Sequence, residues 1–185
     1  MNKIAFSFVA LTSIFLLSCG HSFTDHQDEQ IKKLELRLDS GFLEINAIDT
    51  SKAFASAFHF KENIAFFQSE MKDTITPQTA KIIDRYYSVK KGFILFQSTY
   101  APTKAEFITL RGQIENLRHD ASEGLLEQSQ FDKYFHLESN NLILAEESLT
   151  QMVYAITTVQ KIYDELNPKM DSIIAASISH HTASE

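Results

Sequence analysis

The chain contains one cysteine, no tryptophan, five glycines and three prolines in 185 residues. A single cysteine, Cys19, cannot form an internal disulfide, and it excludes both a CxxCH haem attachment and a cysteine-rich zinc site. The sequence also lacks a GxSxG nucleophile elbow and a glycine-rich phosphate loop. Scarce glycine and proline leave little material for loops, and abundant Leu, Ile, Glu, Gln and Lys favour a mostly helical protein.

Basic charge is also scarce, since 17 Lys and Arg stand against 24 Asp and Glu, for a formal net charge of −7. Nucleic-acid binding requires clustered basic residues, so we expect no nucleic-acid partner. The acidic balance equally disfavours electrostatic attachment to an anionic lipid surface.

The N-terminus carries one early charge, Lys3, followed by an uninterrupted apolar or small-residue run from Ile4 to Leu17. This run is too short for a spanning helix, which needs about 20 residues. A core helix would show a polar face, whereas this run has only Ser and Thr as polar residues. A short positive start before a short apolar region is typical of a secretory signal, so we predict a signal peptide over residues 1–18.

The sequence "LLSC" (Leu16 to Cys19) ends that run and resembles the lipobox of bacterial lipoproteins. The resemblance implies that the Cys19 thiol receives a diacylglycerol and that cleavage makes Cys19 the acylated mature N-terminus. Two or more acyl chains anchor a protein stably, whereas one does so only marginally. Gly20, in place of an aspartate that would retain the protein at the inner membrane, implies the outer membrane by the same resemblance.

The remaining chain has the size of one domain. We predict a flexible tether over residues 19–30, a single helical domain over residues 31–178 and a disordered tail over residues 179–185.

Apolar residues recur at alternating spacings of three and four, which predicts helices that pack against one another. The longest such stripe comprises Leu142, Ala145, Leu149, Met152, Ile156, Val159, Tyr163, Leu166, Met170 and Ile173. Three earlier stripes comprise Phe60, Ile64, Phe67 and Met71; then Ile82, Tyr86, Val89, Phe93, Phe96 and Tyr100; then Phe107, Leu110, Ile114, Leu117 and Ala121.

Residues typical of helix starts and ends lie between these stripes. Thr76 is a predicted N-cap with Pro77 at the first helical position, Pro102 would begin the next helix, and Gly124 would end it. Short connections between long helices predict an all-α, up-down antiparallel bundle of four long helices plus an N-terminal helical segment. The last stripe keeps its phase across Pro168, so we expect a kink there or a fresh helix capped by Asn167.

The stretch from Leu34 to Asp49 is ambiguous. Its apolar and polar residues alternate as in a hairpin with a turn at Asp39 to Gly41, but its apolar residues also fit a helix. Leu, Glu and Arg are helix formers, and a lone hairpin is marginal in water. We therefore favour helix over residues 34–48.

Three segments, "IDTSKA" from Ile48, "FIT…LRHDASEGLLEQSQFDKYFHLE" from Phe107 and "IYDELNPKMDSII" from Ile162, are similar to segments of small helical-bundle lipoproteins of Bacteroidota. The resemblance implies the helices and the localisation. It implies no catalytic residues, because that family is functionally uncharacterised.

No cofactor or metal site is predicted. Di-iron bundles use Glu-x-x-His, a motif that this sequence does not contain. Glu115, His119 and Glu123 share a helix face, but they lie off the apolar stripe, and we interpret them as a solvated face with Arg111 and Arg118. His180 and His181 fall in the predicted tail, where too few ligands converge for a site.

The stretch "FASAFHFKENIAFF" (Phe54 to Phe67) has more phenylalanine than one core face requires. Core packing accounts for most of it. The surplus, Phe54, Phe58 and Phe66, is a candidate partner patch or apolar pocket.

These observations predict a non-enzymatic lipoprotein of the cell envelope, anchored through Cys19, that contacts another envelope protein. The alternative is a binding protein that holds an apolar small molecule or a metal ion between helices. An enzyme with an unrecognised site is a third hypothesis, which a buried polar cluster unexplained by packing would favour.

Overall fold

The computed structural model describes residues 23–69 and 75–182, and every regular element in these ranges is an α-helix. The helices are α1 (Asp25–Ala47), α2 (Thr50–Ser69), α3 (Pro77–Tyr87), α4 (Lys90–Ser122) and α5 (Gln128–Thr182). Within the described ranges, no helix is both long and apolar enough to cross a membrane.

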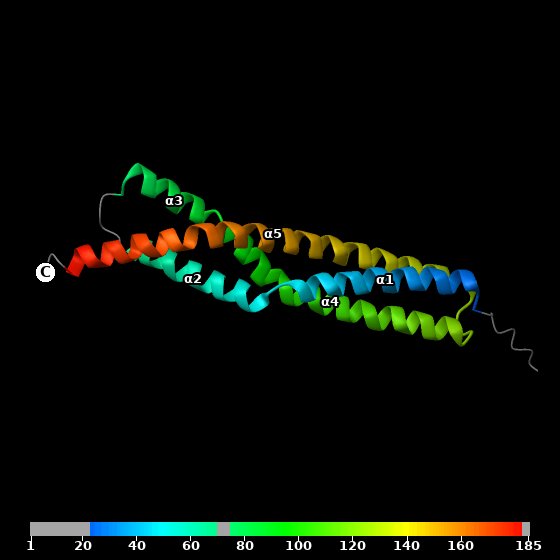
Figure 1. Ribbon diagram of the computed structural model, residues 1–185. Helices are drawn as coiled ribbons and strands as arrows, with labels where there is room; N and C mark the ends of the chain where they lie inside the picture. Colours follow the sequence, from blue (N-terminus) through cyan, green and yellow to red (C-terminus); the bar gives the residue numbers. More distant parts are fainter. Residues whose placement is uncertain (1–22, 70–74, 183–185) are drawn as a thin grey trace, which may run out of the picture.

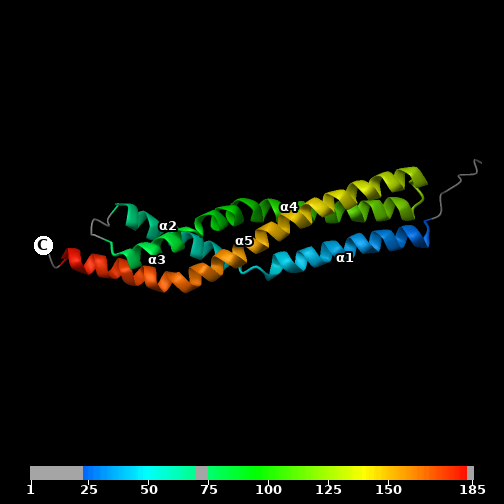
Figure 2. The same cartoon turned by 90° about the horizontal axis from the view of Figure 1, so that it is seen from above.

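The five helices form three antiparallel arms of an elongated bundle (Figure 1). The first arm is α1 followed by α2, the second is α3 followed by α4 in the opposite direction, and the third is α5 alone. Figure 2 shows the same arrangement from above, with α5 running along both other arms. Helix α5 contacts each of the other four helices. The predicted all-α, up-down antiparallel bundle is confirmed.

The first arm begins earlier than predicted. Thr24 and Gln27 form a capping box, in which each side chain accepts a hydrogen bond from the other's backbone N–H, and Asp25 and Asp28 place negative charge at the helix N-terminus. Helix α1 therefore starts at Asp25, and the prediction of a flexible tether is wrong for residues 25–30. Residues 19–22 lie outside the described ranges. Helix α1 continues to Ala47, as we favoured over a hairpin.

The second arm begins as predicted, with the Thr76 hydroxyl accepting from the Thr79 N–H and Pro77 at the start of α3. The predicted helix start at Pro102 is wrong, because Pro102 lies inside α4. The arm changes helix earlier, at Ser88 and Val89. Phe96, Tyr100, Thr103 and Phe107 keep the spacing of four, three and four across the proline, so α4 presents one continuous packing face through it.

Helix α5 also continues through its proline, Pro168, so it is not broken there. Figure 2 shows it bending in its orange part. Asn167 is not a cap, because it lies within the helix and its side chain donates to Asp171 at 2.9 Å. The helix extends to Thr182, so the predicted disordered tail is wrong for residues 179–182, and residues 183–185 lie outside the described ranges.

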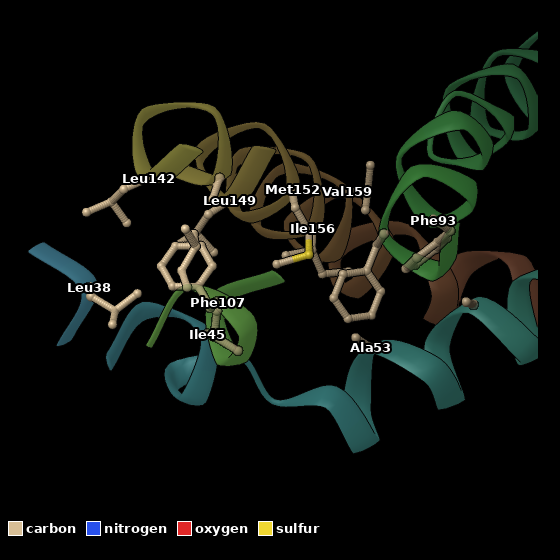
Figure 3. Close-up of a cluster of buried hydrophobic side chains, with 14 of the residues drawn as sticks. Leu38, Ile45, Ala53, Phe93, Phe107, Leu142, Leu149, Met152, Ile156 and Val159 are labelled. Carbon is tan, nitrogen blue, oxygen red and sulfur yellow. The ribbon is translucent and has the colours of Figure 1, made fainter. Parts of the chain in front are cut away.

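The predicted stripes form the core. All members of the α5 stripe from Leu142 to Met170 are buried, and Ile173 is partly buried. The stripe from Phe107 to Ala121 is buried in full, while Met71 lies outside the described ranges. Figure 3 shows how Leu38 and Ile45 of α1 meet Phe107 of α4 beneath α5.

Ion pairs join the arms along their exposed edges. Arg118 of α4 binds Glu35 of α1 through two hydrogen bonds of 2.7 and 2.9 Å and also binds Asp28, and Arg111 binds Asp39. The Lys and Arg pairs with α5 in the described ranges are Arg37–Glu146, Lys52–Asp164 and Arg85–Glu165. Arg111 and Arg118 therefore bridge α4 to α1, which corrects the interpretation that they belong to one solvated face with Glu115 and His119.

Candidate functional site

The clearest candidate site is a groove between α2 and α4, in the half of the bundle away from the start of α1. It has a volume of about 540 Å³. Its lining, as far as the structure describes it, comes from α2 (Ala57, Phe58, Phe60, Lys61, Ile64, Ala65, Gln68) and α4 (Lys90, Phe93, Ile94, Gln97). Among the described residues only these two helices supply the lining, so the groove has two walls and is open on its outer side. We call it the α2–α4 groove.

One large apolar side chain stands exposed on each wall. Phe58 of α2 is 62% exposed and Ile94 of α4 is 54% exposed. Both carry apolar area that folding leaves in contact with water, and such area marks interaction sites when it is contiguous with an apolar groove.

The three phenylalanines of the candidate patch predicted from the sequence lie in different environments and do not form one patch. Phe58 lines the α2–α4 groove. Phe54 lies one turn earlier and packs against Phe96 and Tyr100 of α4, with ring centroids 5.3 and 6.3 Å away, although it stays 41% exposed. Phe66 makes an edge contact with Phe67 and is not a lining residue of the groove.

Among the described residues, the charges that line the groove are positive. They are Lys61 and Lys90, and no described Asp or Glu lines the groove. No carboxylate in the described part of the chain pairs with either lysine; Lys90 donates to the Tyr87 hydroxyl at 2.9 Å instead. In a chain with a net charge of −7, this is a locally basic surface.

Buried aromatic rings form the floor of the groove and continue beneath it. Phe60 contacts Phe93 and Tyr86 at 5.8 and 5.2 Å between ring centroids, and Phe93 contacts Tyr163 of α5 at 5.7 Å. Gly92 lets α4 approach α5 closely at this level, because a Cβ there would lie 2.2 Å from Val159 Cγ1. The floor is therefore tightly packed.

A polar cluster lies directly behind these rings. It consists of His59 and Asn63 from α2, Tyr86 from α3, and Tyr163, Asn167 and Asp171 from α5.

The cluster is closed by hydrogen bonds among the three arms. The fully buried Tyr86 donates to Asn167 Oδ1 at 2.8 Å, and Asn63 Nδ2 lies 3.1–3.2 Å from oxygens of Tyr86, Asn167 and Asp171. The Tyr163 hydroxyl lies 2.9 Å from His59 Nδ1. These bonds satisfy polar groups that would be costly to bury unpaired, and they fix the register of the arms.

The two tyrosines of the cluster stay protonated at neutral pH. Burial raises the pKa of Tyr163 to about 12 and raises the pKa of Tyr86 further above its ordinary value. Such hydroxyls donate hydrogen bonds and do not act as bases or nucleophiles at neutral pH. The hydroxyls of Tyr86 and Tyr163 therefore serve as hydrogen-bonding groups that join the three arms.

Sequence reasoning missed this cluster. It treated Tyr86 and Tyr163 as apolar members of their stripes, although a buried tyrosine needs a partner for its hydroxyl. The need for a hydroxyl partner predicts that polar residues such as Asn63 and Asn167 lie next to these tyrosines.

A second groove of about 660 Å³ lies where α1 passes into α2 against α5. Its floor includes Ala53 and Ile156. Its charged lining has both signs, and Lys52 is paired with Asp164 at 2.7 Å. Since these charges are partly compensated within the chain, this groove specifies a ligand less sharply than the α2–α4 groove.

The other sequence candidates do not converge on a site. Glu115, His119 and Glu123 are all exposed on or just beyond α4. Among the described residues, no group of three or more His, Cys, Asp or Glu is placed to hold a metal ion. Cys19 lies outside the described ranges, so its lipidation stays a prediction.

Comparisons with known proteins found no family model, no curated protein and no solved structure that matches this chain significantly.

Proposed function

We propose that this protein is a non-enzymatic lipoprotein of the bacterial cell envelope, anchored through Cys19 and located at the outer membrane, that acts by contacting another envelope protein. The observation that carries the contact is the pair of exposed apolar side chains, Phe58 and Ile94, on the two walls of the α2–α4 groove. The support for the anchor is the apolar run that ends in the "LLSC" sequence.

The position of the groove suits a contact made away from the bilayer. Only five residues, 20–24, separate Cys19 from α1, and they span at most about 18 Å. An anchor at Cys19 would keep the start of α1 near the membrane. Helix α5 has 55 residues, which corresponds to about 80 Å. Helix α2, which forms one wall of the groove, lies in the half of the bundle farther from the start of α1 (Figure 1).

Replacement of the cysteine tests the anchor. Wild-type protein from its native membrane should have the mass of a chain that starts at an acylated Cys19, and Cys19→Ala should remain an unprocessed, unlipidated precursor. Normal maturation of Cys19→Ala would contradict the proposed anchoring.

Photo-crosslinking in intact cells tests the contact. A photo-crosslinking amino acid in place of Phe58 should give a discrete product with one envelope protein. The same amino acid in place of Leu36, which is 69% exposed on α1, is the matched control and should not. Equal products from both positions, or none from position 58, would contradict a specific contact at the groove.

The second candidate function is the binding of an apolar small molecule. It is favoured by the volumes of the two grooves, about 540 and 660 Å³, since ligand pockets measure roughly 300–1,000 Å³. Native mass spectrometry of protein from its own membrane distinguishes the two functions, because a stoichiometric ligand would favour the second.

A further inference from the structure

We propose that the α2–α4 groove binds an amphipathic helix of the partner protein, with the apolar face of that helix in the groove and acidic residues along its flanks. The inference rests on the proposed function and names the chemistry of the partner. Its first basis is shape. A groove walled by two helices and open on its outer side is the site into which a third helix packs, with apolar residues at positions i, i+3, i+4 and i+7 as anchors.

Its second basis is charge. Lys61 and Lys90 lie on opposite walls, with no described carboxylate in the lining and none paired to them. A helix seated between the walls would bring its two flanks near these two ammonium groups. Glutamate or aspartate on the flanks would be attracted, and lysine or arginine repelled, so the rim selects an acidic partner.

Its third basis is the rigidity of the floor. Phe60 and Phe93 rest on Tyr86 and Tyr163, whose hydroxyls are held by the polar cluster. A floor that is already ordered costs little conformational entropy when a helix packs on it, and this favours binding to the groove as it stands.

The test uses the full chain in phosphatidylcholine nanodiscs, with empty nanodiscs as a blank. The probe is a fluorescent synthetic helix of about 18 residues, or five turns, with leucine on one face and glutamate on both flanks. Two further peptides serve as comparisons: one has lysine flanks, and the other has the composition of the probe in scrambled order. Fluorescence anisotropy gives the affinities.

The glutamate-flanked helix should bind wild type about tenfold or more tightly than the lysine-flanked helix, because two rim charges change from attraction to repulsion. The double variant Lys61→Glu with Lys90→Glu should reverse that order. Phe58→Ser should weaken the binding of both helices. The matched controls Lys133→Glu and Leu36→Ser, both exposed and remote from the groove, should leave both affinities unchanged. Circular dichroism melting shows whether each variant is folded.

Several results would overturn the inference: equal binding of the scrambled peptide, tighter binding of the lysine-flanked helix, or the same effect from Lys133→Glu as from the groove variants. Binding of palmitate without binding of either helix would assign the groove to a small amphiphile. Dimerisation of the chain that Phe58→Ser abolishes, without peptide binding, would assign it to a second copy.

The inference and the proposed function can fail separately. If position 58 crosslinks to an envelope protein but the charge reversal has no effect on peptide binding, only the chemistry of the partner is wrong. If peptide binding follows the predicted order but Cys19→Ala matures normally, only the anchoring is wrong.

Discussion

Gly41 of α1 lies directly against the ring of Phe107 of α4, so that a Cβ at position 41 would stand 2.1 Å from Phe107 Cε1. Phe107 is completely buried and also contacts the ring of Phe42 edge-on at 5.7 Å. The ring therefore has little room to move. The glycine allows α1 and α4 to approach one another at this level.

Gly41→Ala should lower the free energy of unfolding by about 1–3 kcal/mol, because overpacking a core outweighs the better helix propensity of alanine. Gly112→Ala is the matched control, since a Cβ there meets nothing within 4 Å. It should raise the free energy of unfolding by about 0.5–1 kcal/mol. Urea unfolding measures both, and a stabilising Gly41→Ala would show that the two helices can separate without cost.

Tyr86→Phe should lower the free energy of unfolding by about 1–3 kcal/mol, because it removes the buried hydroxyl that donates to Asn167 and lies 3.2 Å from Asn63 Nδ2. Tyr87→Phe is the neighbouring control. Tyr87 is 39% exposed, and its hydroxyl accepts only from the surface Lys90 among the described residues, so its loss should change stability by less than about 0.5 kcal/mol. Equal effects of the two variants would mean that the polar cluster contributes nothing.

The free energy of unfolding should decrease at alkaline pH because the Tyr163 hydroxyl ionises less readily in the folded protein than in the unfolded chain. Its folded-state pKa is raised by burial to about 12, whereas an unfolded tyrosine titrates near pH ~10. The contribution is therefore complete below pH ~10 and is lost as pH rises toward ~12. Tyr163→Phe should lose less stability over that interval than wild type does. Chemical unfolding at stepped pH measures this, and identical alkaline losses in both proteins would refute it.

The pKa of Glu165 reports on one ion pair whose contribution to stability is lost at acidic pH. Hydrogen bonds from Arg85, at 2.7 Å to each carboxylate oxygen, lower the pKa of Glu165 below its ordinary value of 4.5. A lowered folded-state pKa gives stability that is present above the ordinary value and lost as pH falls through the folded one. Arg85→Gln should return the pKa of Glu165 toward 4.5 in a carboxyl-carbon NMR titration. Arg111→Gln, on α4 facing α1, should leave the pKa of Glu165 unchanged.

Much of the fold could be predicted because the apolar residues at alternating spacings of three and four are the ones that are buried. The α5 stripe places almost every member in the core, since a helix with one apolar face must bury it. The breaks were harder to predict. Proline alone predicts a helix start at Pro102 and a kink or a fresh helix at Pro168, yet both prolines lie inside helices. Phe96, Tyr100, Thr103 and Phe107 keep their spacing across Pro102, as the α5 stripe does across Pro168. Phase is therefore a better guide than proline alone.

The groove could be predicted only in part. The excess of phenylalanine in α2 predicts a surface at Phe58. The opposite wall, with Ile94, depends on how α2 and α4 are placed relative to one another, and the periodicity within one helix does not specify that. Gly41 shows the same limit. In the sequence it suited a turn, whereas its real role is to make space for a ring from another helix.

The single long helix α5 spans the breaks in the other two arms. Both other arms are interrupted, at Ile48 and Asp49 and at Ser88 and Val89, but α5 runs uninterrupted past both joints and contacts every helix on either side. At each joint, α5 contacts the helices on both sides of the break. Helix α5 therefore packs across both joints and connects the end of the bundle that holds the groove to the end at which α1 begins.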